Sequence, residues 1–380
     1  MDPAELVAGG SYGRVDRGGD HHSGRRGRDA AGELARGRGD HPGGGLLGHG
    51  GAGGRRRGRG QKAGDAAVAE IIGQSELSRK VQKSIERLKL FEPPEGYYLA
   101  FYGGKDSVVC KRLLDMAGVK YDATYRITSV DPPELVQFIK DKHPDVRREW
   151  PRYKDGSIVT MWNLIPKKLM PPTRIQRYCC HDLKEDGGDG RMCVTGVRWD
   201  ESVNRRKNQG IVTMMNKKMT DELDDLGFFA NNRGGVVLVN DNDASRRMVE
   251  QCYKRGKTNL NPIIDWTDRE IWDFIHAENV PYCGVYDEGY HRLGCIGCPM
   301  AGKERRARDF RRWPIYKALY MKALDRMIEE RRKKNRPAWR CNGMDQENAT
   351  ARDIFRWWME DDSVPGQMEI EDIMEDENDI

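Results

Sequence analysis

The sequence predicts an α/β protein with a Rossmann-like, doubly wound and mainly parallel sheet that is covered by helices on both faces. Short apolar runs of strand length alternate with helical patterns between residues 96 and 280. Such alternation is typical of parallel sheets, whose strands are joined by crossover helices. Residues 66–358 are enough to bury a sizeable core. We expect a disordered N-terminal arm and a helical C-terminal extension in addition to this domain.

The expected elements follow one another in a regular order. The expected strands are 96–102, 121–128, 192–197 and a weak one at 236–239. The expected helices are 66–90, 108–116, 135–142, 161–169, 244–254, 268–277 and 310–332. The helix at 268 is preceded by a capping box formed by Thr267 and Glu270. The segment 204–260 is otherwise expected to be an irregular insertion.

Charge is distributed unevenly along the chain, whose 65 Lys+Arg and 60 Asp+Glu residues give a net charge of +5. Residues 1–64 hold 21 of the 43 glycines, with 12 basic and 7 acidic side chains. Residues 303–340 hold 15 basic and 5 acidic side chains, whereas 359–380 hold ten acidic and no basic ones. The overall balance therefore does not indicate a dedicated nucleic-acid binder.

These composition changes divide the chain into four parts. The expected parts are a Gly/Arg-rich arm (1–65), an α/β domain (66–302, with the insertion at about 204–260), a basic helical extension (303–358) and an acidic tail (359–380). The arm is either a nucleic-acid-touching segment or a spacer. The basic stretch 303–340 is either a nucleic-acid-binding face or a solvated helix that caps the core.

Targeting signals and cysteine content limit the cellular compartment in which this protein is expected. No apolar run approaches the roughly 18 residues of a membrane-spanning helix. The N-terminus lacks the apolar core and cleavage site of a signal peptide. Nine cysteines in such a chain favour reduced thiols, some of them metal-binding, over a disulfide framework. We therefore expect a cytoplasmic protein.

A glycine-rich turn joins the first expected strand to the next helix, and its residues are Gly103, Gly104, Lys105, Asp106 and Ser107. Such a turn exposes backbone N–H groups to an anion, and the helix dipole, the lysine and the serine add to the attraction. The spacing is not that of a Walker A loop. The turn predicts a phosphate cradle, and the alternative is a turn that only joins strand to helix.

Two arginines, Arg198 and Arg205, follow the end of the strand expected at 192–197. Parallel sheets bind ligands at this edge, and a guanidinium matches phosphate or sulfate oxygens with two parallel hydrogen bonds. These residues predict an anion site, with solvated surface charge as the alternative. Arg174 and Arg177 form a weaker candidate pair of the same kind.

Four cysteines form two pairs, Cys179 with Cys180 and, 115 residues later, Cys295 with Cys298. A C-x-x-C turn places two thiolates within reach of one metal centre, and two pairs supply four soft ligands. Adjacent cysteines suit a cluster with separated irons better than a single zinc ion. The pattern predicts an iron–sulfur cluster, with zinc or unligated structural cysteines as alternatives.

In combination these motifs resemble the adenylyl-sulfate and phosphoadenylyl-sulfate (APS/PAPS) reductase family of the adenine-nucleotide alpha-hydrolase (PP-loop) superfamily. The resemblance covers about 97–300. The glycine turn is similar to the family's S-G-G-x-D-S loop, and 196–205 is similar to its G-x-R-x-x-x-S-x-x-R loop. The stretch 261–272 is similar to its N-P-L-x-D-W stretch. Thr128-Ser-Val-Asp131 occupies the place of its nucleotide-facing turn.

The resemblance implies a set of site residues. Those implied to bind nucleotide or phosphate are Tyr102, Gly103, Gly104, Lys105, Asp106, Ser107, Thr128, Asp131, Gly196, Arg198, Ser202 and Arg205. Lys105, Arg198 and Arg205 are also implied to be catalytic. It implies further that Cys179, Cys180, Cys295 and Cys298 hold a four-iron, four-sulfur (4Fe-4S) cluster, and that a thiol reductant such as thioredoxin serves the reaction.

The sequence departs from this family in two places. Tyr102 stands where the phosphate loop has its first serine, and a phenol does not reach the same place as an aliphatic hydroxyl. The C-terminal E-C-G-[LI]-H motif, which supplies the attacking cysteine, is absent. Cys341, in Arg-Cys-Asn-Gly-Met, is the candidate nucleophile, with an incidental loop cysteine as the alternative.

Three functions follow from these features. The first is a reductase that converts APS or PAPS to sulfite with thiols. The second is an ATP pyrophosphatase or sulfurtransferase that modifies nucleic acid through 303–340, with Asp106 or Asp131 orienting Mg²⁺. The third is a non-enzymatic protein that binds a nucleotide or a cluster.

Overall fold

The computed structural model describes residues 76–360 apart from Asp186, Asn216, Leu226, Arg233, 240–256 and 340–345. All of them belong to the second of two units into which the chain divides, Arg59–Ile380. The predictions for the arm at 1–65, for the helix at 244–254 and for the tail beyond residue 360 lie outside the described residues. No helix of the described part is long and apolar enough to cross a membrane.

Within the described residues, eight strands form one sheet in the order β3-β2-β1-β4-β8-β5-β7-β6. The strands are β1 (Tyr97–Ala100), β2 (Tyr121–Arg126), β3 (Arg147–Glu149), β4 (Met192–Val194), β5 (Val212–Met214), β6 (Phe228–Ala230), β7 (Val236–Leu238) and β8 (Thr258–Leu260). The first five strands in this order pair in parallel, and β5, β7 and β6 continue the sheet antiparallel.

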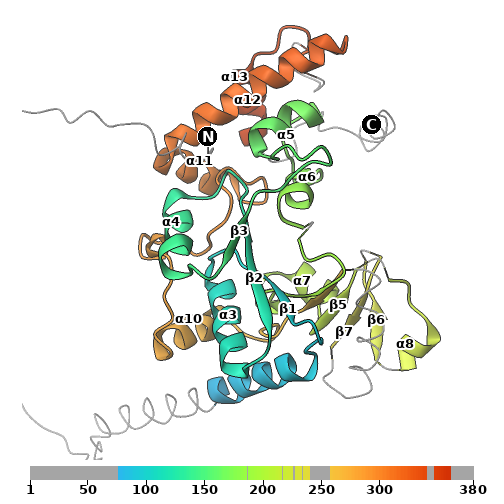
Figure 1. Cartoon of the computed structure of the whole chain (residues 1–380). Helices are drawn as coiled ribbons and strands as arrows, with labels where there is room; N and C mark the ends of the chain where they lie inside the picture. Colours follow the sequence, from blue (N-terminus) through green and yellow to red (C-terminus); the bar gives the residue numbers. More distant parts are fainter. Residues whose placement is uncertain are drawn as a thin grey trace, which may run out of the picture. The chain divides into compact units, whose positions relative to one another are not determined.

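Helices lie on both sides of the sheet (Figure 1), so the predicted fold class is confirmed. Residues 76–90 are helical. The other helices are α3 (Lys105–Ala117), α4 (Pro133–Lys142), α5 (Met161–Lys168), α6 (Tyr178–Cys180), α7 (Val203–Asn208), α8 (Asp221–Asp225), α10 (Asp268–Ala277), α11 (Lys303–Arg312), α12 (Pro314–Lys333) and α13 (Ala351–Glu360). Three short helical turns are η1 (His181–Glu185), η2 (Trp199–Glu201) and η4 (Gly284–Tyr286).

The segment 204–260 contains more regular structure than the sequence predicts. The weak strand at 236–239 is confirmed as β7, whereas β5, β6 and β8 are unpredicted strands of three residues each. Three residues show too little alternation to be recognised by period. Because β8 pairs with both β4 and β5, it joins the parallel and antiparallel parts of the sheet.

The basic extension is broken where the sequence predicts one helix over 310–332. The structure ends α11 at Arg312 and begins α12 at Pro314, with Trp313 in a non-helical conformation between them. Proline has no N–H and clashes with the preceding turn, so it is tolerated at the start of a helix but not in its interior. The predicted helix start was therefore wrong.

The helices of the extension pack together and against α5, as Figure 1 shows in orange, red and green. Aromatic rings fill their contacts: the Tyr320 and Trp358 ring centroids lie 4.8 Å apart, and those of Phe310 and Phe355 lie 5.3 Å apart. Large aromatic side chains contribute much of the stabilisation of such a core. The extension is thus part of the folded unit.

Asn261 joins strands at the carboxyl edge of the sheet, where parallel sheets place ligands. Its side chain is fully buried, its Nδ2 donates to the Gly210 carbonyl over 2.7 Å, and its Oδ1 accepts from the Thr195 hydroxyl. Its backbone N–H donates to the Ile211 carbonyl over 2.7 Å. One amide therefore connects the end of β4 to the chain that enters β5.

We expect Asn261→Ala to lower the free energy of unfolding by about 2–3 kcal/mol, because the buried partners lose their hydrogen bonds. Urea denaturation followed by circular dichroism measures the change. Gln137→Ala, on the exposed face of α4, is the control and is expected to change stability by less than about 0.5 kcal/mol. Equal effects of the two substitutions would contradict the assignment.

Candidate functional site

The glycine turn predicted to hold phosphate follows β1 and begins α3. Gly103 has φ +69°, a conformation that favours glycine, and an added Cβ would lie 2.8 Å from side-chain atoms of Leu135 and Ile139. Gly104 then caps α3, which starts at Lys105. The turn is therefore a tight connection between β1 and α3.

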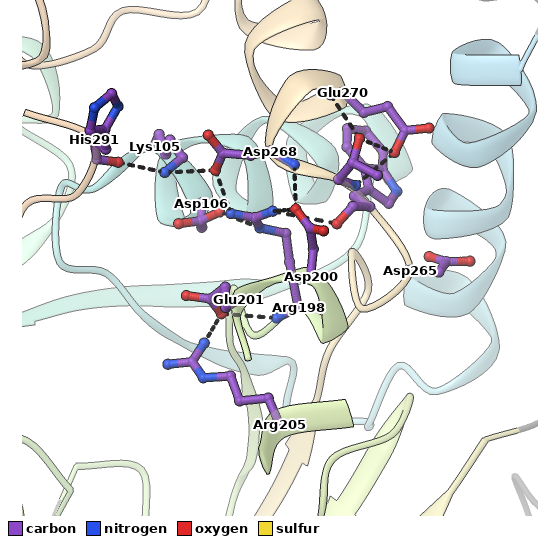
Figure 2. Close-up of polar contacts among 12 residues, drawn as sticks. Lys105, Asp106, Arg198, Asp200, Glu201, Arg205, Asp265, Asp268, Glu270 and His291 are labelled. Atoms are coloured by element: carbon purple, nitrogen blue, oxygen red, sulfur yellow. Dashed lines mark hydrogen bonds and ion pairs between the residues drawn. The ribbon is translucent and has the colours of Figure 1, made fainter. Parts of the chain in front are cut away.

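Two polar side chains of this turn, those of Lys105 and Ser107, form hydrogen bonds or ion pairs with other groups of the protein. The Lys105 side chain is buried, and its Nζ lies 2.9 Å from the His291 carbonyl and 3.0 Å from Asp268 Oδ1 (Figure 2). The Ser107 hydroxyl donates to the Gly104 carbonyl over 2.9 Å. The lysine thus connects the turn to the segment before Cys295, and the serine closes the first turn of α3.

Arg198 lies among carboxylates rather than toward solvent. Its guanidinium is 2.7 Å from Asp106, 2.8 Å from Asp268 and 3.6 Å from Asp200, and the residue is only 2% exposed. Figure 2 shows these carboxylates converging on it. Gly196 makes room for Asp106, because a Cβ at Gly196 would lie 2.7 Å from the Asp106 Cβ. The structure therefore gives Arg198 internal partners, and its predicted role as an anion ligand stays a prediction.

Arg205 faces other arginines. Burial, followed by the positive charge of Arg292 and by those of Arg198 and Arg177, lowers the pKa of Arg205 to about 10. Glu201 is paired with Arg205 and lies 3.0 Å from Arg292. Like charges gathered around a partly buried guanidinium form a site that an anion would stabilise. We name Arg177, Arg205 and Arg292 the arginine cluster.

The sequence prediction missed Arg292 and ranked Arg177 as a weak candidate. Arg292 lies three residues before Cys295, in a segment where only the cysteines were predicted to belong to the site. Ser202 was predicted to bind nucleotide, but its hydroxyl caps α7 by accepting from the Arg205 N–H over 3.2 Å. Ser202 therefore orients the helix that carries Arg205.

Thr128 and Asp131 lie beside a cysteine. Cys295 Sγ is 3.9 Å from both Thr128 Oγ1 and Asp131 Oδ1. Asp131 is buried, and it accepts from the Tyr125 hydroxyl over 2.6 Å and from the Thr128 N–H over 3.3 Å. Its backbone carbonyl accepts from Tyr316 over 2.9 Å. This carboxylate is thus held by protein donors.

The four cysteines of the predicted metal site are linked electrostatically, because the other three affect the pKa of Cys179. A hydrogen bond with Cys180, then burial, then the neighbouring charges of Cys180, Cys295 and Cys298 raise the pKa of Cys179. Arg177 Nη2 donates to Cys180 Sγ over 3.5 Å, and Lys184 is hydrogen-bonded to Cys295. Among the described residues, no three His, Cys, Asp or Glu side chains are arranged to hold a metal ion.

Helices α11 and α12 hold the loop that carries Cys295 and Cys298. Asp309 accepts the backbone N–H of Gly297, and the Tyr320 hydroxyl donates to the Ile296 carbonyl over 3.1 Å. Arg305 donates to the Arg292 carbonyl over 2.7 Å. Arg308 donates to the Glu288 and Gly289 carbonyls over 2.6 and 3.1 Å. The basic extension therefore supports the site, which the sequence did not reveal.

A parallel sheet with a glycine turn after its first strand is the architecture of nucleotide-binding α/β proteins. Comparison with known proteins narrows this class. A family model described as the phosphoadenosine phosphosulfate reductase domain matches residues 160–301. Residues 160–301 are therefore similar to the APS/PAPS reductase family.

Individual relatives match over limited lengths. An uncharacterized protein of Methanocaldococcus jannaschii is 23% identical over 211 residues, which cover 53% of this chain and 35% of that protein. The adenosine 5'-phosphosulfate reductase of Neisseria meningitidis serogroup A is 41% identical over 56 residues, 14% of this chain and 23% of the relative. The chain thus spans about a third or less of the length of these curated relatives.

A solved structure, the PAPS reductase from Candida auris in a phosphate complex, aligns with 58% of this chain and 95% of its own. Its TM-score is 0.34 and its sequence identity 12%.

Cys341, the candidate nucleophile, lies outside the described residues.

We expect Gly297→Ala to destabilise the loop between Cys295 and Cys298. Gly297 has φ +72°, and an added Cβ would lie 2.6 Å from the Phe310 ring, so both strain and overlap oppose the substitution. The free energy of unfolding should fall by about 1–3 kcal/mol. Thermal denaturation measures the change.

Gly294→Ala in the same loop is the matched control. Its φ is not positive, and the nearest atom to an added Cβ is 3.9 Å away, at the end of Arg305. This variant should melt within a few degrees of the wild type. A Gly297 variant that also melts like the wild type would contradict the tight packing of the loop.

Proposed function

We propose that this chain is a sulfonucleotide reductase that releases sulfite from APS or PAPS with thiols as the reductant. The observation that carries the proposal is the arginine cluster, in which Arg205 and Arg292 share Glu201 and Arg177 contacts a cysteine. The charge of Asp106 raises the pKa of Arg205 and the charge of Arg177 lowers it. Arg177 in turn donates a hydrogen bond to Cys180 Sγ. A nucleotide with its phosphate at the glycine turn would extend a sulfate toward these guanidinium groups.

The chemistry requires a thiolate that attacks sulfur. In the proposed first step, the Cys341 thiolate forms an S–S bond to the sulfate sulfur, and the bond from sulfur to the phosphate oxygen breaks. The electron pair of that bond leaves with AMP when the substrate is APS, and with adenosine 3′,5′-bisphosphate when it is PAPS. A second thiol, from a dithiol reductant, then attacks Cys341 Sγ, and sulfite leaves as a mixed disulfide forms. The remaining reductant thiol displaces Cys341 and completes the two-electron oxidation of the dithiol.

The arginine cluster and the buried ion pairs have different tasks in this proposal. Arg205 and Arg292 bind the three sulfate oxygens and neutralise charge as AMP leaves. Arg198 positions Asp106 and Asp268 and so fixes the start of α3 relative to the start of α10. Lys105, which bonds Asp268 and the His291 carbonyl, holds the segment that carries Arg292.

We further propose that Cys179, Cys180, Cys295 and Cys298 hold a 4Fe-4S cluster. Two observations support the proposal: the pKa of Cys179 responds to the other three thiols, and two cationic side chains, Arg177 and Lys184, bond sulfur atoms of the set. Adjacent cysteines suit separated irons better than one zinc ion. When bound, such a cluster would supply iron–thiolate bonds that connect the two cysteine pairs.

The alternative of an enzyme that modifies nucleic acid has less support. It needs a free basic face on 303–340, yet Arg305 and Arg308 bind backbone carbonyls of the loop before Cys295. Arg312 pairs with Glu288 at 3.0 Å and with Glu134 at 2.8 Å. These side chains are used within the protein.

The proposal predicts sulfite release from APS or PAPS in the presence of thioredoxin or dithiothreitol, measured beside pyrophosphate release from ATP. Arg205→Ala should lower kcat/KM for sulfite release by about 10- to 100-fold, the loss of one charge-assisted hydrogen bond of about 1.5–3 kcal/mol. Arg206→Ala is the matched control, because Arg206 is exposed on the same helix; its activity should stay within about twofold of wild type.

Other results would separate the parts of this proposal. Pyrophosphate release from ATP without sulfite release from APS or PAPS would show that the chain is an ATP-cleaving enzyme and not a reductase. Sulfite release that survives Cys341→Ser would show that another group is the nucleophile. Equal losses of kcat/KM in Arg205→Ala and Arg206→Ala would show that the arginine cluster does not bind the substrate.

Anaerobically purified protein should be brown, absorb broadly near the blue and contain about four irons per chain, the content of one 4Fe-4S centre. Cys298→Ser should lower the iron content, whereas Cys283→Ser should leave it unchanged, because Cys283 is buried in the core and belongs to neither pair. Metal analysis and absorption spectra measure both. A colourless protein with one zinc would refute the cluster.

A further inference from the structure

Tyr286, in the short turn η4, reaches the start of α3 from a distant part of the chain. Its hydroxyl oxygen accepts the backbone N–H of Lys105 over 2.9 Å and also accepts the backbone N–H of Leu293. The side chain is 8% exposed. An added Cβ on Gly104 would lie 3.5 Å from this hydroxyl, so the oxygen lies next to the glycine turn.

The ring of Tyr286 is held by its neighbours. The Trp272 ring lies 5.1 Å away in an edge-on arrangement, and the Lys105 ammonium lies 5.8 Å from the centre of the ring. Tyr282 completes the aromatic group at 6.5 Å. A phenol fixed in this way offers its hydroxyl in one direction with little loss of side-chain entropy on binding.

The hydroxyl retains an unused donor. A tyrosine oxygen has two lone pairs and one proton, and the amides of Lys105 and Leu293 use both lone pairs. No acceptor for the Tyr286 proton is present among the residues that the structure describes. Burial above all raises the pKa of Tyr286, so the proton is present at physiological pH. A buried donor without an acceptor carries a desolvation cost that a bound anion would remove.

The hydroxyls of the glycine turn itself are used elsewhere. The Tyr102 hydroxyl, at the position of the family's serine, donates to the Lys184 carbonyl over 3.2 Å. The Ser107 hydroxyl donates to the Gly104 carbonyl. Tyr286 therefore brings to the start of α3 a hydroxyl that the turn does not supply.

We propose that Tyr286 is a substrate-binding residue, whose hydroxyl donates to a phosphate oxygen of the nucleotide at the start of α3. The inference rests on the nucleotide site of the proposed function and adds a ligand to it from outside the phosphate-loop motif. Tyr286 thus compensates for the serine that Tyr102 replaces.

The test compares AMP with adenosine, which lacks the phosphate, by isothermal titration calorimetry on the full chain. Tyr286→Phe should weaken AMP binding by about 10- to 100-fold, the value of one lost hydrogen bond to a charged group, and should leave adenosine binding unchanged. Tyr282→Phe is the matched control. It lies in the same aromatic group but its hydroxyl bonds Asp287 over 3.0 Å, so both affinities should stay at the wild-type value.

Other outcomes overturn the inference. Equal weakening of AMP and adenosine by Tyr286→Phe would mean that the hydroxyl only supports α3, and tighter AMP binding would mean that it blocks the site. If the phenylalanine variant does not fold, 3-fluorotyrosine at position 286 provides the second measurement, and its stronger donor should bind AMP more tightly. Unchanged affinity there also overturns the inference. A wild-type protein that does not prefer AMP over adenosine would remove the proposed nucleotide site itself.

Discussion

The site depends on one buried guanidinium. Arg198 follows β4 and binds Asp106 at the start of α3 and Asp268 at the start of α10, and Asp268 in turn binds Lys105. A buried charge is costly unless it is paired, so each of these groups needs the others in place. Removing one partner would leave a buried charge uncompensated. The network therefore fixes the start of α3 and, through the Lys105 contact with His291, the segment that carries Arg292.

The C-terminal extension completes the site from outside the sheet. Its first helix presents donors to the carbonyls of 288–292 and an acceptor, Asp309, to the Gly297 amide. Backbone groups of a long loop need such partners when the loop is covered. The extension thereby holds the C-x-x-C turn and the arginine cluster in one unit. Two of its basic side chains, Arg305 and Arg308, serve three carbonyl groups of this loop.

The sequence predicted the parts of the fold that have strong periodicity or chemistry of their own. The strand and turn before α3, the capping box at Thr267 and the two cysteine pairs are local patterns, and the structure contains β1, α3 and α10 as expected. Three-residue strands such as β5 and β8 depend on their neighbours in the sheet. No local pattern marks them.

Site residues that act through distant contacts were equally hidden. Tyr286 contacts the glycine turn, and Arg292 acts on Arg205, each from more than 80 residues away in the chain. Neither was among the residues that the sequence predicted for the site. Arg198 was found by its place after a strand, but its partners Asp106 and Asp268 come from two other segments. Sequence spacing identifies a candidate arginine but does not reveal whether its charge is already neutralised within the fold.

The arginine cluster is unfavourable without an anion, and this has a thermodynamic consequence. The depressed pKa of Arg205, caused first by burial and then by its arginine neighbours, reflects a charge that the folded protein stabilises poorly. Glu201 compensates only part of this charge, since it is shared between Arg205 and Arg292. An anion that binds only the folded chain would relieve the repulsion and raise stability by mass action. Affinity for an anion and stability of the loop are therefore coupled, because the helices that hold Cys295 also hold Arg292.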